Sequence, residues 1–139
     1  MKKSHHRSRT LGVVLFLIVI GVLGRLIFPP FANLSKELPE GNFTSGDLFQ
    51  EFTGDPTGAY IRLVNKVIIL EGEIAATGDD YIMVGKDMCM VRCMFRKSIY
   101  DRKPCLKSGD RVTLKGVCRG LNLTEVLVTH CIILNKPAN

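Results

Sequence analysis

The residues with the widest chemical range lie in segment 88–95, whose sequence is MCMVRCMF. Successive side chains of a β-strand point to opposite faces, so every second residue of this segment would share a face. That face would carry Met88, Met90, Arg92 and Met94, with Tyr81 and Met83 continuing it on a neighbouring strand. We predict that this face binds a ligand, and the predicted contact residues are Tyr81, Met83, Met90, Arg92, Met94, Arg96 and Lys97.

A single-stranded oligonucleotide is one ligand class for this face. Arg92 would pair with a phosphate and Tyr81 would stack on a base, and the half of the domain from residue 92 onward is strongly basic. Single-strand binding normally uses several stacking rings, however, and the chain has no Trp. Most of the net charge of +6 belongs to residues 1–30, which hold five basic residues and no acidic one. Nucleic acid is therefore an alternative partner and not the preferred one.

A soft metal ion is the second alternative ligand. Thioether sulfurs favour Cu(I), and Met88 and Met90 would present two of them on one side of a strand. The third reading is that the methionines form an adaptable contact surface, covered by the chain's own helices or by another protein of the cell envelope. We prefer this third reading, and we predict no cofactor.

The sequence does not predict an enzyme. His5 and His6 lie in the N-terminal tail, which leaves His130 as the one histidine of the domain. No pattern places an orienting group beside any of the five cysteines, as nucleophilic catalysis would require. The preferred reading of three of them, Cys93, Cys118 and Cys131, is that they are small core residues. A disulfide between Cys118 and Cys131 is the alternative, since the two would lie on neighbouring strands of the barrel described below.

The sequence of residues 1–30 follows the pattern of a membrane anchor. A basic tail is followed by the uncharged run 11–24, and then by Arg25, three apolar residues and Pro29. Residues 11–28 would form a helix of about 27 Å, which spans a thin hydrocarbon core if Arg25 reaches the far interface. The basic tail should stay in the cytoplasm, so the rest of a single-pass membrane protein would be periplasmic or at the cell surface. A cleaved signal peptide is the alternative.

One domain should follow the anchor. Residues 31–43 have no regular period and predict a linker, and residues 44–139 are long enough for one small core. Thr44 is a suitable cap for a first short helix, and Asp55-Pro56 is a suitable start for a second one.

Beyond these helices the pattern becomes that of β-strands. Five strands are predicted near residues 66–76, 81–86, 88–95, 111–119 and 125–134. Gly72 and Gly116 lie inside the first and fourth of them, which indicates strands that bend strongly in a small closed sheet. The predicted fold is all-β, a five-stranded OB-fold barrel preceded by one or two short helices and an N-terminal transmembrane helix. Its predicted core contains Ile68, Leu70, Ile74, Val84, Val91, Phe95, Val112, Leu114 and Ile132.

Four stretches of the domain also follow a known family pattern. They are the helix that ends in Ala59-Tyr60 before Asn65-Lys66-Val67, then Leu70-x-Gly72-x-Ile74, Val91-Arg92-Cys93-Met94-Phe95, and a C-terminal part that runs from Lys107-x-Gly109-Asp110-x-Val112-x-Leu114-x-Gly116-x-Cys118-x-Gly120 to Val126-x-Val128-x-x-Cys131. With these residues, segment 48–134 resembles the tRNA_anti-like family of exported bacterial OB-fold proteins. The resemblance implies an OB-fold and a location in the cell envelope. It implies neither catalytic residues nor tRNA binding.

Overall fold

The computed structural model describes residues 5–27, 34–96 and 106–135. The chain divides into two compact units, Met1–Ala32 and Asn33–Asn139. The first unit holds one helix, and the second holds all the strands described below.

Helix α1 of the first unit is His5–Ile27. Its large apolar side chains from Val13 to Leu23 are exposed. Among the described residues, no helix combines the length and the apolar character that crossing a membrane requires. Phe28, the last residue of the predicted span, lies outside the described residues.

Two capped helices precede the strands of the barrel, as predicted. Helix α2 is Ser45–Gly54, and Thr44 and Asp47 form a reciprocal capping box at its start. Helix α3 is Pro56–Leu63, where Asp55 accepts a hydrogen bond from a backbone N–H and proline occupies the first turn. The sequence therefore determines both helix starts locally.

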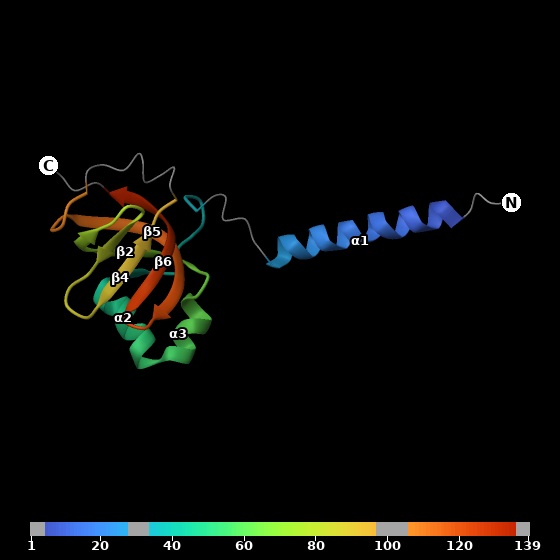
Figure 1. The fold of residues 1–139 in the computed structure, drawn as a ribbon. Coiled ribbons are helices and arrows are strands. Elements are labelled where there is room, and N and C mark those ends of the chain that lie inside the picture. The colour runs from blue at the N-terminus through green and yellow to red at the C-terminus, as the bar shows by residue number, and fades with distance from the viewer. Residues whose placement is uncertain (1–4, 28–33, 97–105, 136–139) are drawn as a thin grey trace. The chain divides into compact units, whose positions relative to one another are not determined.

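Five strands close into a barrel. They are β2 (Val67–Thr77), β3 (Tyr81–Val84), β4 (Met90–Met94), β5 (Arg111–Asn122) and β6 (Glu125–Asn135). Their order is β2-β3-β4-β6-β5, and β2 also pairs with β5, which closes the sheet. The β4–β6 pair is parallel, and the other neighbours in the barrel are antiparallel. This closed barrel, with α2 and α3 at one end (Figure 1), confirms the predicted five-stranded architecture and is consistent with the OB-fold.

The barrel interior and helix α2 form one core. Leu48 and Phe52 of α2 are almost fully buried against the strands, so the helix closes one end of the barrel. The predicted core residues that are buried are Ile68, Leu70, Ile74, Val84, Val91, Phe95, Val112 and Leu114.

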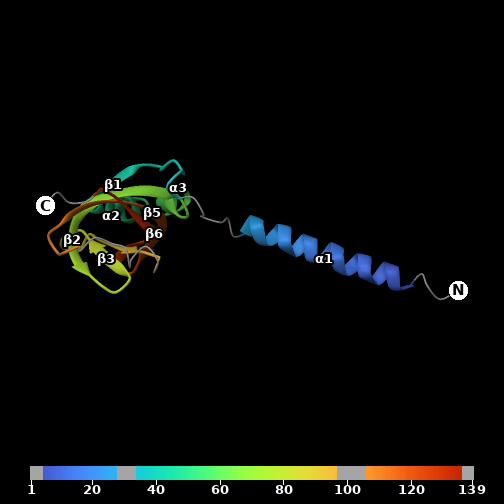
Figure 2. The ribbon, with the colours of Figure 1, turned by 90° about the horizontal axis from the view of Figure 1, so that it is seen from above.

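The structure differs from the sequence-based prediction at strand β1 (Asn42–Thr44) and in strand β6. Part of the expected linker forms strand β1, which runs parallel to β2 (Figure 2). Ile132 was expected in the core, but Cys131 is buried and Ile133 packs against the core in its place. The cause is a bulge in β6 at His130, whose φ of 57° shifts the inward alternation by one residue.

Both interior glycines lie where another chain segment approaches closely. A Cβ on Gly72 would come within 2.5 Å of Val84 Cγ1. A Cβ on Gly116 would come within 2.5 Å of Val128 Cγ1 and within 3.2 Å of the Thr129 carbonyl oxygen. Gly116 thus lies directly against the bulged part of β6, where no side chain fits without movement.

Candidate functional site

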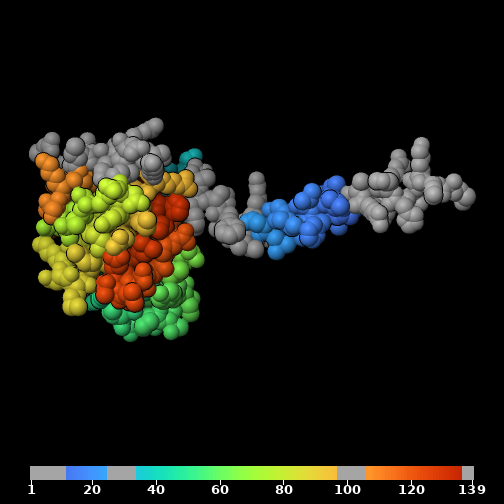
Figure 3. Space-filling view, viewed as in Figure 1, coloured from blue at the N-terminus to red at the C-terminus, as the bar shows by residue number. Residues whose placement is uncertain are grey.

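The predicted ligand face forms on the outside of β3 and β4. The register places Tyr81 opposite Met94 and Met83 opposite Arg92, and all four side chains are half-buried. On the parallel neighbour β6, Leu127 lies opposite Arg92. Figure 3 shows β3, β4 and β6 as one continuous surface above helices α2 and α3. The structure therefore brings together the predicted residues of both strands.

Arg92 is the centre of a polar cluster on this face. Its Nε donates to Glu125 Oε1 at 2.6 Å, and a terminal nitrogen donates to Glu125 Oε2 at 3.3 Å. The hydrogen bond with Glu125 raises the pKa of the Arg92 guanidinium. The guanidinium carbon also lies 4.6 Å from the centre of the Tyr81 ring, in a cation–π contact.

This cluster reduces the ability of Arg92 and Tyr81 to contact a ligand. The carboxylate of Glu125 neutralises the guanidinium charge, and the guanidinium occupies one face of the ring. A nucleic acid would have to displace both contacts before it could use this arginine and this stacking platform. Glu125 was not among the predicted contact residues, because nothing local in the sequence links it to a residue 33 positions earlier.

The methionines lie beside a separate pocket of about 420 Å³. Its lining residues are Phe49, Met83, Asp87, Met88, Met90, Leu123, Thr124 and Glu125. Met88 and Leu123 are 81% and 95% exposed, so two large apolar side chains stand at its rim. Met94 belongs to the same face of β4 and does not line the pocket.

Basic groups gather on a different part of the outer surface. Arg119 donates to Thr129 Oγ1 at 3.1 Å, and His130 Nδ1 lies 3.1 Å from the same oxygen. Partial burial lowers the pKa of His130, and the nearby guanidinium groups of Arg96 and Arg119 lower it further. Lys97, which was predicted beside Arg96, lies outside the described residues.

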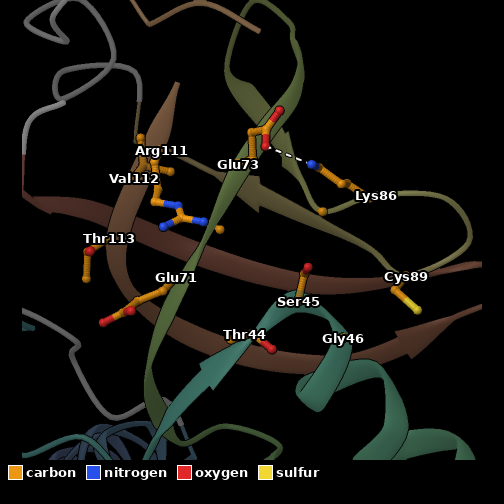
Figure 4. Close-up of a pocket in the computed structure, with 12 residues that line it drawn as sticks. Thr44, Ser45, Gly46, Glu71, Glu73, Lys86, Cys89, Arg111, Val112 and Thr113 are labelled. Carbon is orange, nitrogen blue, oxygen red and sulfur yellow. Dashed lines mark ion pairs between the residues drawn. The ribbon is translucent and has the colours of Figure 1, made fainter. Parts of the chain in front are cut away.

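A second pocket of about 500 Å³ lies between the N-terminus of α2, β2, β5 and the loop after β3 (Figure 4). Lys86 Nζ is 3.0 Å from Glu73 Oε2, and Arg111 lies opposite Glu73 in the β2–β5 register. Glu71 supplies a second carboxylate. Because two carboxylates balance two cations here, the pocket does not select for either charge. None of these residues was predicted to contact a ligand.

Three described cysteines, Cys93, Cys118 and Cys131, are buried thiols, whereas Cys89 is half-buried. Cys118 and Cys131 are both free, and the register sets Cys118 opposite Val128, so the predicted disulfide between them is not formed. The bulge at His130 instead turns Cys131 toward Cys93. Burial and a hydrogen bond with Cys131 raise the pKa of Cys93, and burial raises the pKa of Cys118 to about 11.

Comparisons with known proteins support the fold. No family model matches the chain, and no curated protein matches it, so membership of the tRNA_anti-like family stays a prediction. The chain is similar to the solved structure of a "putative nucleic acid-binding lipoprotein" from Klebsiella pneumoniae, with 14% identity and a TM-score of 0.54. That match covers 78% of this chain and 100% of the other. A chain of the Stn1–Ten1 complex of S. pombe is more distant, with 10% identity, a TM-score of 0.40, and 73% and 81% of the two chains covered.

Proposed function

We propose that this protein is a membrane-anchored binding module that acts outside the cytoplasm and catalyses no reaction. The observation that carries the proposal is the outer face of β3 and β4. There, a closed barrel groups a ring, a guanidinium and several thioethers in half-buried positions beside an open pocket. Such a mixture suits non-covalent contact with a partner protein or a ligand.

The nucleophile candidates support a non-catalytic role. Cys118 has a pKa of about 11 and Cys93 a pKa raised well above its ordinary value, so both thiols are protonated at neutral pH. A protonated, buried thiol is a poor nucleophile.

The membrane anchor is supported by the sequence of the first unit. Helix α1 exposes large apolar side chains from Val13 to Leu23, and such an apolar helix is stable when lipid or another protein covers it. The basic residues before it would hold the N-terminus in the cytoplasm.

We expect the chain to stay in the membrane fraction of bacterial cells after a high-salt wash, because salt screens contacts between charges but does not weaken apolar burial. A photo-cross-linking residue in place of Met94, on the β4 face, should give a specific cross-linked product. The same residue in place of Ile61, an exposed position of α3, should not.

Release of the protein by salt, or as a shortened soluble form, would contradict the anchor. Equal cross-linking from both positions would contradict a binding role for the β3–β4 face. The two results are independent, so each part of the proposal can fail alone.

An oligonucleotide is the second candidate ligand, because Arg96, Arg119 and His130 gather at one place. The similarity to a protein described as nucleic acid-binding supports the same candidate. The site differs from the one expected at Arg92, whose charge Glu125 already neutralises.

If this candidate is correct, the detergent-solubilised chain should bind a fluorescent single-stranded oligonucleotide. A plot of the logarithm of the binding constant against the logarithm of the salt concentration should have a slope of about −1.4, which is −0.7 for each of two phosphate contacts. Arg96→Gln and Arg119→Gln should each flatten the slope by about 0.7, because each removes one contact. Arg62→Gln, on α3, is the control and should leave the slope unchanged. A slope that responds equally to all three changes would show binding through overall charge, and would remove this candidate.

A further inference from the structure

The pocket beside β3 and β4 collects three of the five methionines of the chain. Met83 belongs to β3, Met90 to β4, and Met88 to the connection between them. From these positions we infer that Met83, Met88 and Met90 form a binding site for a soft monovalent metal ion, Cu(I) or Ag(I). This inference does not depend on the membrane anchor or on oligonucleotide binding.

The strand register explains why Met83 and Met90 lie near each other. Val84 pairs with Val91 and Met83 pairs with Arg92, so Met83 and Met90 are diagonal neighbours on the outer face. Diagonal neighbours in an antiparallel pair lie within reach of long side chains. The unbranched methionine side chain has three rotatable bonds, which lets two such sulfurs approach a common point.

The connection between the strands adds the third thioether. It turns sharply at Asp87, which has a φ of 55°. Met88 follows directly, and it lines the same pocket although it is 81% exposed. A large apolar side chain that is this exposed to water is not packed in the core, so core packing does not explain the position of Met88. Coordination of a metal would provide it with a contact.

The chemistry of the pocket favours a soft ion over a hard one. Three neutral sulfurs match Cu(I) and Ag(I), whereas Ca²⁺ and Mg²⁺ require several oxygen ligands. Of the two carboxylates in the lining, Glu125 is already held by Arg92, which leaves Asp87 as the one whose charge would balance a monovalent cation. Within the described part of the chain, no group of three His, Cys, Asp or Glu side chains forms a competing metal site.

Ag(I) is a better probe of this site than Cu(I), because Cu(I) must be kept reduced during the titration and Ag(I) needs no reductant. Thiols also bind silver, so the test uses the full-length chain in detergent with Cys89→Ser and Cys105→Ser, which removes the half-buried thiol and the one outside the described residues. The protein carries ¹³C-methyl methionine, which gives each thioether its own signal. The titration is run at pH 8 and at pH 5, because metal binding to a thiol releases a proton and therefore weakens as the pH falls, whereas binding to a thioether does not.

We expect one equivalent of Ag(I) to bind and to move the methyl signals of Met83, Met88 and Met90, while the signal of Met94 stays in place. Changing any one of the three to Leu, which nearly conserves volume, should weaken binding by about tenfold or more, a loss of about 1.4 kcal/mol. Met94→Leu is the matched control and should bind silver as the parent does.

Three results would overturn the site. They are movement of the Met94 signal together with the others, affinity that falls steeply from pH 8 to pH 5 as thiolate binding would, and equal weakening by Met94→Leu. Met88→Leu in the cross-linking experiment separates this inference from the proposed function, because Met88 lines the pocket but is not among the predicted contact residues of the β3–β4 face. A protein that cross-links normally but binds no silver retains the binding module without the metal site.

Discussion

Phe52→Ala should lower the free energy of unfolding of the second unit by about 3–5 kcal/mol, the usual loss for removing a buried ring. Phe52 is 1% exposed and belongs to the core cluster that α2 shares with the barrel. Its ring also meets the Tyr60 ring edge to face, with the centroids 5.5 Å apart. The change would therefore remove both the packing at the closed end of the barrel and the contact between α2 and α3.

Urea unfolding of residues 33–139, followed by circular dichroism, would measure this loss, because these residues form a compact unit with its own core. Ile61→Ala is the matched control: Ile61 lies on α3 and is 76% exposed, so its loss should change stability by no more than about 0.5 kcal/mol. Similar midpoints for the two variants would show that α2 is not an integral part of the barrel core.

Gly116→Val is the second large effect, with an expected loss of about 1–3 kcal/mol from overpacking. The first atom of the new side chain would lie 2.5 Å from Val128 Cγ1, 3.0 Å from Cys131 Sγ and 3.2 Å from the Thr129 carbonyl oxygen. The sulfur and the carbonyl belong to the bulged segment of β6, so relief would require the backbone of β6 to move.

The same unfolding measurement distinguishes three glycines. Gly72→Val should cost less than Gly116→Val, because the three nearest atoms to the Gly72 Cβ position all belong to side chains, whereas Gly116 also meets a backbone oxygen at 3.2 Å. Gly54→Ala should have little effect, since nothing lies within 4 Å of its Cβ position. If Gly116→Val were as stable as the parent, the close approach of β5 and β6 would not restrict this position.

The architecture was predictable because its signals are local. The caps at Thr44 and Asp55 depend on residues within three positions, and the strand periods depend on neighbours two apart. Gly72 and Gly116 predicted a curved, closed sheet, and β2 does pair with β5 across both of them. Here these local preferences agree with the global fold, except in β6.

The alternation in β6 was predicted incorrectly for a tertiary reason. Val126 and Val128 point inward, and a regular strand would continue that set to His130 and Ile132. The observed bulge reverses the order, and nothing in the local sequence requires it. The left-handed φ of His130 belongs to this bulge, and the bulged segment lies directly against Gly116 of β5.

Except in β6, the sequence by itself determined the strand and helix periods. It also determined the inward and outward faces of β3 and β4, and therefore which side chains share the candidate face. Only the tertiary structure decided the partners of those side chains. Closure of the barrel places Glu125 beside Arg92, joins Met83 to Met88 and Met90 in one pocket, and brings Cys131 to Cys93 in place of Cys118. These contacts depend on strand register and on one bulge, which the packing of the whole barrel sets and which no short stretch of sequence encodes.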